Sequence, residues 1–593
     1  MFQYPIDSEY ILKNKKKIKR KLQENTKMGV QKKIAILGGS TTKDVKLMLE
    51  LFLLDFGIRP QFYESEYGRY WEDGMFPNPE LEEFKPDIIY IHTSFRNITE
   101  LPTISDERDL IEQKIKKQYF HFEQLWQSLC ERYHCPIIQN NFERPVYRLL
   151  GNKDISDFHG KSHFAEQLNQ RFYQYAQEHE NFYINDIAYL QAEYGLHKWS
   201  DPFYWHMYKY ALAVPAIPDL AFNIAKIIKS IYGKNKKAFV LDLDNTLWGG
   251  VVGDEGVENL VLGPEVPMGQ AYSEFQSYIK EHKQMGILLN IASKNDPENA
   301  AAGLGHPDGN LKAEDFISIK ANWEPKSENV IKIAQELNIL PESMVFVDDN
   351  PAEREIVSGQ VSGIAVPEID TVEHYIQNID GNGYFEVTVS AKEDAKRVQM
   401  YQENAERNQL KAAFADYRDY LLALEMKAEI KPFSSVYMAR IAQLTNKSNQ
   451  FNLTTKRYSQ TEIEEAADSQ EYIDLYGKLE DKFGDNGVVS VVIGRQEEQN
   501  CHIELWIMSC RVLKRDMEYT MMDALIEECK KRSIEKIIGY YYPTDKNRMV
   551  KDFYSLQGFH KVSEGNDGST VWEYKIEENY QKKNQVITVK EEK

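Results

Sequence analysis

The chain has 593 residues, of which 42% are hydrophobic, and its formal net charge is −20 at pH 7. This length predicts several domains, and the acidic balance argues against nucleic-acid binding, which requires a basic surface. No apolar run reaches the roughly 18 residues that a membrane span needs, and the five cysteines show no CxxC spacing. We therefore expect a multidomain cytoplasmic protein that binds neither nucleic acid nor a membrane.

The first predicted domain covers residues 1–233. Apolar strands are expected in KKIAILGGS, PDIIYIHTS and HCPIIQNNF, and a helix follows the first of them in TTKDVKLMLELFLLDFG. Strands that alternate with helical patterns predict a parallel α/β sheet. The domain ends after a loop and a helix in KWSDPFYWHMYKYAL.

The second predicted domain covers residues 234–378 and alternates in the same way. Its strands are expected in KAFVLDLD, GILLNIASK and SMVFVDD, and its helices in AYSEFQSYIKEHKQMG, SENVIKIAQELNI and PAEREIV. Polar residues gather where these strands end. Because ligands bind at the carboxyl ends of the strands in open α/β sheets, a site is expected there.

The third predicted domain covers residues 379–593 and begins with a charged, helix-prone joining region. Strands are expected in GVVSVVIGR, CHIELWIMS and KIIGYYYP, and helices in EYTMMDALIEECKKRS and NRMVKDFYSLQG. This order of strands and helices is again an α/β pattern, but it differs from the alternating pattern of the first two domains. The polar tail NYQKKNQVITVKEEK is expected to be frayed.

Asp242 and Asp244 interrupt and end the apolar strand FVLDLDNT. A lone buried carboxylate is costly unless another group pairs with it or coordinates it. The later strand ends and helix starts of this domain add Ser293, Lys326, Asp348 and Asp349. Four carboxylates that converge with one lysine need a counter-charge, and Mg²⁺ suits carboxylates together with a phosphate.

These residue types predict phosphoryl chemistry. Asp242 is a plausible nucleophile toward phosphorus, and Asp244, two residues on, is placed to protonate a leaving oxygen and later deprotonate a water. Ser293 and Lys326 would hold the phosphoryl oxygens, and Lys326 would offset their negative charge.

Four motifs, DLDNT, IASKN, WEPKSEN and VDDNPAERE, occur in the order typical of the haloacid dehalogenase (HAD) superfamily of phosphotransferases, which the central segment resembles. The magnesium ligands expected from this resemblance are Asp242, Asp348, Asp349 and the backbone carbonyl of Asp244. The gaps between the motifs have no room for a cap domain. We therefore expect an open, capless site in which residues 249–256 form a small hairpin flap.

A closer resemblance is to the FkbH-like branch of this superfamily. It rests on DLDNTLWGGVVGDEG and ANWEPKSENV, and on GGSTT and NNFERPVYRLLGN in the first domain, and it extends from about residue 32 to about 577. It implies an enzyme that takes a glyceryl unit from 1,3-bisphosphoglycerate, removes its phosphate and passes the glyceryl group to an acyl carrier protein. The alternative is a stand-alone phosphatase of HAD subfamily IIIC, which acts on an unknown phosphoester and uses its flanking domains for recognition.

A transferase of this kind needs a thiol, and Cys510 is the candidate because Arg511 beside it favours the thiolate. A buried structural cysteine is the other interpretation. The third domain resembles the GCN5-related N-acetyltransferase (GNAT) fold, in which an RxxGxG turn binds coenzyme A. Here Lys514 and Asp516 replace both glycines, so coenzyme A is not expected in the usual way. Lys514 and Arg515 would be free to bind the phosphate of a carrier arm.

The first domain resembles SGNH hydrolases, with Ser40 of GGST as the nucleophile. A triad needs a base and an orienting acid, for which His206 and Asp201 are candidates, and Asn97 would serve the oxyanion hole. The spacing is DxxxxH, whereas the usual spacing in that family is DxxH. A plain turn at Ser40 and a helix cap at Asp201 are the alternatives, and we expect a degenerate binding domain.

Overall fold

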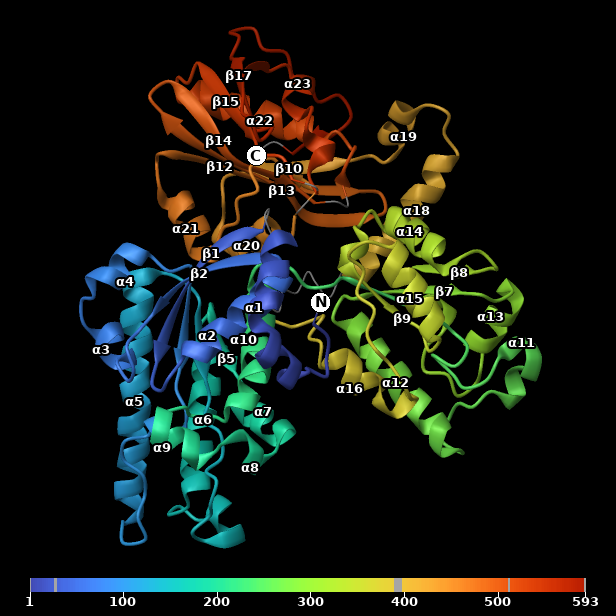
Figure 1. Cartoon of the computed structure of the whole chain (residues 1–593). Coiled ribbons are helices and arrows are strands. Elements are labelled where there is room, and N and C mark those ends of the chain that lie inside the picture. Colours follow the sequence, from blue (N-terminus) through green and yellow to red (C-terminus); the bar gives the residue numbers. More distant parts are fainter. Residues whose placement is uncertain are drawn as a thin grey trace. The chain divides into compact units, whose positions relative to one another are not determined.

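The computed structural model describes residues 2–25, 29–388, 397–448, 450–509, 512–544 and 546–590 (Figure 1). The chain divides into two compact units, Met1–Ile231 with Glu386–Thr388, and Tyr232–Phe385 with Val389–Lys593. Among the described helices, none is both long and apolar enough to cross a membrane. The mixed α/β architecture with parallel sheets confirms the predicted fold class.

The first unit is built on a five-stranded parallel sheet with the order β2-β1-β3-β4-β5. Its strands are β1 (Val30–Gly38), β2 (Ile58–Glu64), β3 (Ile88–His92), β4 (Ile137–Asn140) and β5 (Phe182–Asn185). Its helices are α1 (Ser8–Asn25), α2 (Lys43–Asp55), α3 (Tyr70–Met75), α4 (Pro79–Phe84), α5 (Arg108–Tyr133), α6 (Lys161–Glu178), α7 (Ile187–Tyr194), α8 (Leu196–Trp199), α9 (Pro202–Tyr208) and α10 (Ile217–Ile231).

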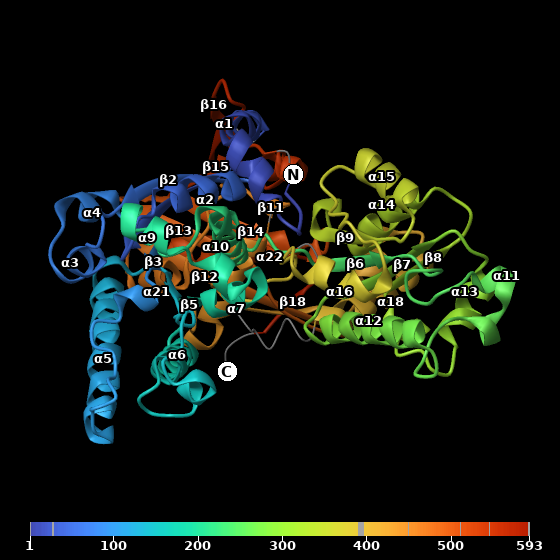
Figure 2. The same ribbon diagram turned by 60° about the horizontal axis from the view of Figure 1, so that its bottom comes forward.

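The second half of strand β1, IAILG, is buried on both faces of the sheet, as is usual for a parallel sheet that helices cover on both sides. Ala35 and Leu37 pack in one core with Trp126 of α5 and Phe164 of α6, while α2 and α10 pack against each other. Helix α5 continues well beyond the sheet, which Figure 2 shows from another side.

The second unit contains a four-stranded parallel sheet with the order β8-β7-β6-β9. Its strands are β6 (Ala238–Leu241), β7 (Leu288–Ser293), β8 (Ser318–Ala321) and β9 (Met344–Val347). The helices around it are α11 (Val252–Glu255), α12 (Pro267–Gln284), α13 (Pro297–Leu304), α14 (Lys326–Leu337), α15 (Pro351–Gln360) and α16 (Val372–Asp380).

The side chains of β6 alternate between two cores, as a strand with a period of two residues requires. Phe239 and Leu241 pack on the face that carries α12 and α16, and Ala238 and Val240 on the face that carries α14 and α15. Two covered faces explain why FVL is continuously apolar and why the polar residues begin only where the strand ends.

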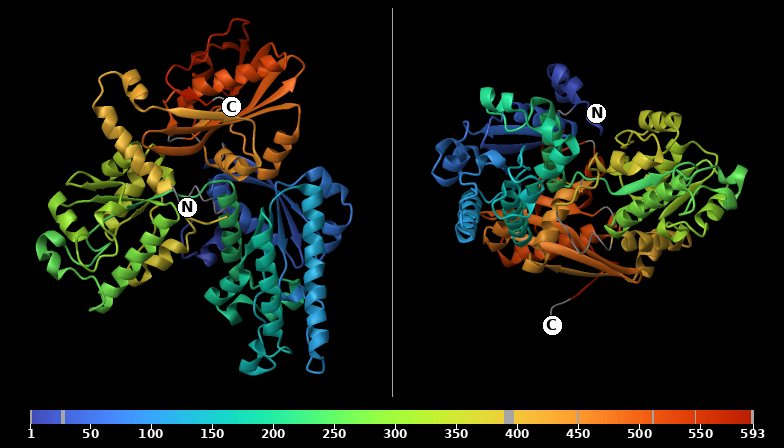
Figure 3. Two further views of the ribbon diagram at one scale, coloured as in Figure 1. Left: turned by 180° about the vertical axis from the view of Figure 1, so that it is seen from behind. Right: turned by 90° about the horizontal axis from the view of Figure 1, so that it is seen from below.

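The remainder of the second unit forms a mixed sheet whose main path is β16-β17-β15-β14-β13-β12-β10-β18, with β11 beside β14. The strands of this sheet are drawn in orange to red in Figure 3. Its strands are β10 (Lys427–Lys431), β11 (Phe451–Asn452), β12 (Tyr472–Asp481), β13 (Gly484–Glu497), β14 (Asn500–Met508), β15 (Lys536–Tyr541), β16 (His560–Glu564), β17 (Thr570–Lys575) and β18 (Thr588–Val589). Its helices are α18 (Arg397–Ala412), α19 (Tyr417–Ala423), α20 (Met438–Lys447), α21 (Gln460–Asp468), α22 (Met517–Lys531) and α23 (Phe553–Leu556).

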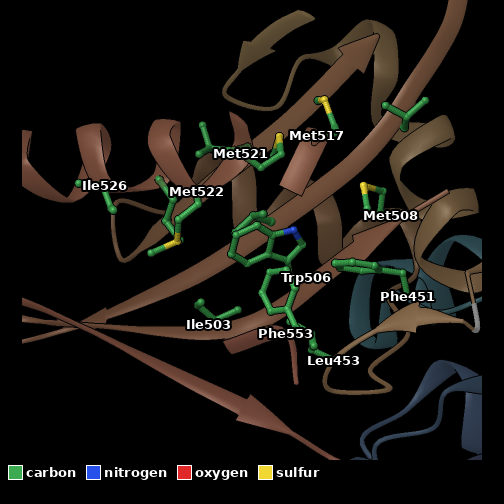
Figure 4. Close-up of a cluster of buried hydrophobic side chains, with 14 of the residues drawn as sticks. Phe451, Leu453, Ile503, Trp506, Met508, Met517, Met521, Met522, Ile526 and Phe553 are labelled. Atoms are coloured by element: carbon green, nitrogen blue, oxygen red, sulfur yellow. The ribbon is translucent and has the colours of Figure 1, made fainter. Parts of the chain in front are cut away.

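The core of this sheet is rich in methionine. Trp506 of β14 lies in the centre of the cluster in Figure 4, with Met521 and Met522 of α22 near it. The ring of Phe553 packs edge-on against the Trp506 indole, with 4.9 Å between centroids. Cys501 and Cys529 are fully buried in the same core, so both are packing residues.

The prediction of a frayed tail is wrong for residues 579–590. The carboxylate of Asp523 in α22 accepts hydrogen bonds from Tyr580 Oη at 2.5 Å and from the backbone N–H of Lys583 and Asn584, both at 3.0 Å. Ile587 is buried, and Thr588–Val589 then pairs with β10. The polar composition of the tail misled the prediction, because one buried carboxylate organises its backbone.

Candidate functional site

The predicted site residues of the central sheet meet at the carboxyl ends of neighbouring strands. Leu241 of β6 pairs with Val347 of β9, so Asp242 and Asp348 leave the sheet side by side. The backbone N–H of Asp242 donates to the carbonyl of Val347 at 3.0 Å. Ser293 ends β7, the neighbour of β6 on its other edge, and is buried.

Three carboxylates converge at this edge. Asp242, Asp348 and Asp349 can each offer one oxygen such that all three oxygens lie within 4.8 Å of one another. The ammonium of Lys326, at the start of α14, lies 2.9 Å from Asp242 Oδ2 and 2.6 Å from Asp348 Oδ2. The other oxygen of Asp242, Oδ1, is buried and has no hydrogen-bond partner.

One ammonium does not neutralise three carboxylates. Burial, and next the charge of Asp242, raises the pKa of Asp348 to about 7 and raises the pKa of Asp349 above its ordinary value. Burial alone would lower the pKa of Lys326, but Asp242 and Asp348 raise it above its usual range. Lys326 therefore stays charged, but its single positive charge does not balance the three carboxylates. A further cation would supply the missing positive charge.

The donor set fits a hard divalent cation. Such an ion takes oxygen ligands, and here three carboxylates converge, one of which has a buried oxygen without a partner. Both the geometry and the raised pKa values favour a bound cation over a cluster of caps and turns. The three carboxylates expected to bind magnesium, those of Asp242, Asp348 and Asp349, are thus brought together.

The carboxylate of Asp244 lies apart from the other three groups, contrary to the expected convergence of four. Its Oδ1 accepts hydrogen bonds from Trp248 Nε1 at 2.9 Å and from the Val252 N–H at 3.1 Å, and its Oδ2 accepts one from Asn295 Nδ2 at 2.9 Å. Burial raises the pKa of Asp244. A carboxyl that is fixed and holds its proton more tightly suits an acid and base.

Three supporting residues had no role in the sequence prediction. Thr246 Oγ1 accepts a hydrogen bond from the Asp349 N–H at 3.1 Å, and Arg354 Nη1 donates to the carbonyls of Asp348 and Asp349, both at 2.8 Å. Trp248 holds Asp244, as described above. The threonine of DLDNT and the arginine of DDNPAERE were visible signals, whereas nothing in the sequence points to Trp248 as a partner of Asp244.

The expected hairpin flap is wrong in form. Residues 252–255 form the short helix α11, and a 3₁₀ turn follows at Val257–Asn259. The segment is closed by an antiparallel bridge in which Gly249 and Val261 exchange hydrogen bonds of 3.1 and 2.8 Å. Outside it, the first motif gap holds only α12, and the second gap holds α13, a 3₁₀ turn and β8. No cap domain lies in either described gap.

In the first unit the predicted triad residues do not contact one another. Ser40 Oγ is buried and without a hydrogen-bond partner, while His206 on α9 is exposed. Asp201 caps α9, accepting from the Phe203 N–H at 2.8 Å, as the alternative interpretation has it. Asn97 Nδ2 donates to the Gly39 carbonyl at 3.1 Å. The structure therefore shows no assembled triad among these residues.

The candidate thiol Cys510, with Arg511, lies outside the described residues. Lys514 and Asp516 both adopt left-handed φ, 64° and 63°, the region that favours glycine, so these side chains stand where the glycines of the related turn are expected. Arg515 is not free to bind a phosphate, because it is buried and pairs with Asp481 at 3.2 Å.

Comparisons with known families agree with this geometry. The family model of the FkbH N-terminal domain matches residues 33–229, and that of haloacid dehalogenase-like hydrolases matches residues 264–355, a range that includes Ser293, Lys326, Asp348 and Asp349. A comparison with curated proteins gives no match.

Among solved structures, the chain is similar to the N-terminal part of the protein BF1531 from Bacteroides fragilis, which contains a phosphatase domain complexed with Mg. The identity is 30%, the TM-score is 0.59, and the match covers 63% of this chain and 99% of that one. The ribosomal-protein-S18-alanine N-acetyltransferase of Escherichia coli matches with 11% identity over 26% of this chain and 99% of its own, but its TM-score of 0.21 supports no conclusion. With its phosphatase domain, the chain belongs to the FkbH-like proteins of the haloacid dehalogenase superfamily.

Proposed function

We propose that this chain removes the phosphate from a phosphorylated glyceryl unit derived from 1,3-bisphosphoglycerate and passes the glyceryl group to an acyl carrier protein in the cytoplasm. Residues 234–378 would form the phosphatase domain, between a binding domain at 1–233 and an acyl-transfer domain at 379–593. The observation that carries the proposal is Asp242 Oδ1, a buried oxygen without a partner, on a carboxylate whose other oxygen binds Lys326 at 2.9 Å.

The carboxylates of Asp242, Asp348 and Asp349 and the backbone carbonyl of Asp244 would hold Mg²⁺. When bound, this ion would supply positive charge against the phosphoryl oxygens. The magnesium of the similar phosphatase domain supports this choice of metal, as does the convergence of three carboxylates around one ammonium.

The chain's own residues account for the remaining chemistry. Asp242 Oδ1 attacks phosphorus, the phosphoester P–O bond breaks, and Asp244 gives its proton to the leaving oxygen. A water then attacks the aspartyl phosphate, Asp244 takes the proton of that water, and phosphate leaves. Lys326 uses two of its three N–H donors on Asp242 and Asp348, and with Ser293 it would hold the phosphoryl oxygens.

Acyl transfer would need the thiol of Cys510. Its thiolate would attack the carbonyl carbon of the acyl phosphate, the C–O bond to phosphate would break, and a thioester would form. The thiol of a carrier arm would then take the glyceryl group by exchange. Arg515 pairs with Asp481, so among the described residues of this turn Lys514, which is exposed, would bind the phosphate of such an arm.

The second candidate is a stand-alone phosphatase for another phosphoester. It is favoured by the site itself, since the roles of Asp242, Asp244 and Lys326 require no thiol. In this case the flanking domains would serve recognition, and His206 and Ser40 would remain outside catalysis, as their lack of contact suggests.

The two candidates are separated by incubating the full chain with Mg²⁺ and 1,3-bisphosphoglycerate, then measuring intact mass and released phosphate. A glyceryl adduct that disappears in Cys510→Ser supports the transferase. Phosphate release from other esters without an adduct supports the phosphatase. Asp242→Asn should abolish phosphate release and leave the circular dichroism spectrum unchanged, and full activity in this variant would remove both assignments.

A further inference from the structure

Trp323 exposes a large apolar side chain on the loop that leads into Lys326. It lies on the loop between β8 and α14, and 69% of its surface is exposed. Its indole is nevertheless fixed, because Nε1 donates a hydrogen bond to Asp296 Oδ1 at 2.9 Å. Single exposed apolar residues are ordinary on protein surfaces, so the meaning of this one depends on what surrounds it.

The loop that carries Trp323 is tied to the second motif. The backbone N–H of Asn322, its preceding neighbour, donates to the carbonyl of Ser293 at 3.2 Å. The side chain of Asn322 accepts from Asn329 Nδ2 at 2.8 Å, which joins the same loop to α14. Lys326 follows Trp323 by three residues. The indole is thus anchored one residue from the contact with Ser293.

Asp296, the partner of the indole, belongs to the other loop at this rim. The residue before it, Asn295, donates to Asp244 Oδ2 at 2.9 Å. The hydrogen bond between Trp323 and Asp296 therefore links the loop that fixes Asp244 to the loop that leads into Lys326. An exposed ring held in this position is pre-organised, so a ligand that stacks on it orders little of the protein.

We propose that Trp323, oriented by Asp296, is a specificity-determining platform on which the organic body of a phosphorylated substrate stacks while its phosphoryl group meets Asp242. The platform rests on the proposed phosphatase function. An indole face favours flat or C–H-rich groups. The substrate class is therefore a phosphoester with a body long enough to reach the rim, and a capless site leaves room for such a body.

Two phosphorylated compounds test the platform. The proposal predicts that the ring of p-nitrophenyl phosphate stacks on Trp323, whereas acetyl phosphate carries only an acetyl group and cannot stack. In Trp323→Ala, KM for p-nitrophenyl phosphate should rise by about threefold to tenfold, the range expected for an aromatic pair. Its kcat should stay within about twofold, because Trp323 does not touch the reacting atoms. Both constants for acetyl phosphate should stay unchanged.

Two further variants are controls for the platform. Trp323→Phe keeps a stacking face, so it should retain more of the affinity for p-nitrophenyl phosphate than Trp323→Ala. Ile319→Ala trims an apolar side chain of β8 that is 40% exposed and should leave both substrates unaffected. An equal rise of KM for both substrates in Trp323→Ala, or the same rise in Ile319→Ala, would overturn the proposal.

A binding measurement separates the platform from the phosphatase assignment. In Asp242→Asn, which should not turn the substrate over, p-nitrophenyl phosphate with Mg²⁺ should quench tryptophan fluorescence. Adding Trp323→Phe should reduce that quenching, although seven of the eight tryptophans remain, among them Trp248 beside Asp244. If the wild-type protein releases phosphate from neither compound but the quenching depends on Trp323, the result supports the platform and contradicts the proposed phosphatase reaction. Quenching that is unchanged by Trp323→Phe rejects the platform.

Discussion

Lys326 and Asp348 form an ion pair of 2.6 Å in which neither side chain exposes more than 4% of its surface. The same ammonium is 2.9 Å from Asp242, so one buried cation serves two carboxylates. Removing one partner from a buried ion pair leaves the other charge without compensation. The stability of the central sheet is therefore tied to the residue that is expected to bind the phosphoryl group.

Replacing Lys326 by Met should destabilise the central domain. The variant keeps most of the aliphatic stem but leaves Asp242 and Asp348 buried without their cation, at a cost of about 3–5 kcal/mol. Hydrogen exchange of the β6 and β9 amides reports the opening free energy of this sheet. The control is Lys320→Met, which breaks a partly exposed pair with Glu336 and should cost about 0–1 kcal/mol. Equal losses in the two variants would contradict the buried-pair argument.

Magnesium should stabilise the protein through the same carboxylates. At a concentration of about 100 times its Kd, an ion that binds only the folded state adds about 2.7 kcal/mol, measured as a rise in Tm. Asp349→Asn should reduce that rise, because it removes one of three converging carboxylates. Asp315→Asn is the control. Asp315 does not belong to this group of carboxylates, and it pairs with Lys283 at a distance of 2.6 Å. An equal magnesium effect in both variants would place the ion elsewhere.

The sheet and the meeting of its strand ends could be predicted from the sequence. Continuous apolar runs identified β6, β7 and β9, and the rule that ligands bind at the carboxyl ends of parallel strands brought Asp242 and Asp348 together. The direction of the Asp244 side chain could not be predicted, because it depends on Trp248 and Asn295, whose hydrogen bonds arise only from tertiary packing.

A contact between distant residues explains the error in the C-terminal tail. The C-terminal tail is polar, and its local pattern indicates no structure, but Asp523 binds the Lys583 backbone from 60 positions away. His206 lies on a helix that begins at a capping aspartate, and a spacing motif does not distinguish a cap from a catalytic acid. The hydrophobic periodicity of the sequence therefore located the strands, whereas the hydrogen-bond partners of single polar side chains could be identified only from the structure.

Glu143 in the first unit should make stability fall as pH rises. Burial raises the pKa of this carboxyl from 4.5 to about 7, although the Phe95 N–H and Arg96 act against the shift. Below pH 4.5 the folded and unfolded chains both hold the proton, so its contribution to stability is fully present. Between pH 4.5 and 7 the unfolded chain loses the proton first, and about 3 kcal/mol is lost.

Glu143→Gln removes this titration. Hydrogen exchange of the β4 amides, compared between variant and wild type at each pH, cancels the intrinsic pH dependence of exchange. The variant should gain about 3 kcal/mol relative to wild type between pH 4.5 and 7 and show a constant difference outside that window. A difference that does not change with pH would show that the pKa of Glu143 is the same in the folded and unfolded chains, and would contradict this prediction.

Gly303 in α13 should resist a substitution that normally stabilises a helix. A Cβ at this position would lie 2.6 and 2.7 Å from two ring carbons of Trp248, whose indole N–H holds Asp244. Gly303→Ala should therefore cost about 1–3 kcal/mol through overpacking and lower phosphate release by shifting Asp244. At Gly359 in α15 a Cβ meets nothing within 4 Å, so Gly359→Ala should gain up to about 1 kcal/mol and keep full activity. Thermal unfolding checks the expected stability of the two variants, and phosphate release checks their activity. Full activity in Gly303→Ala would show that Trp248 does not set the position of Asp244.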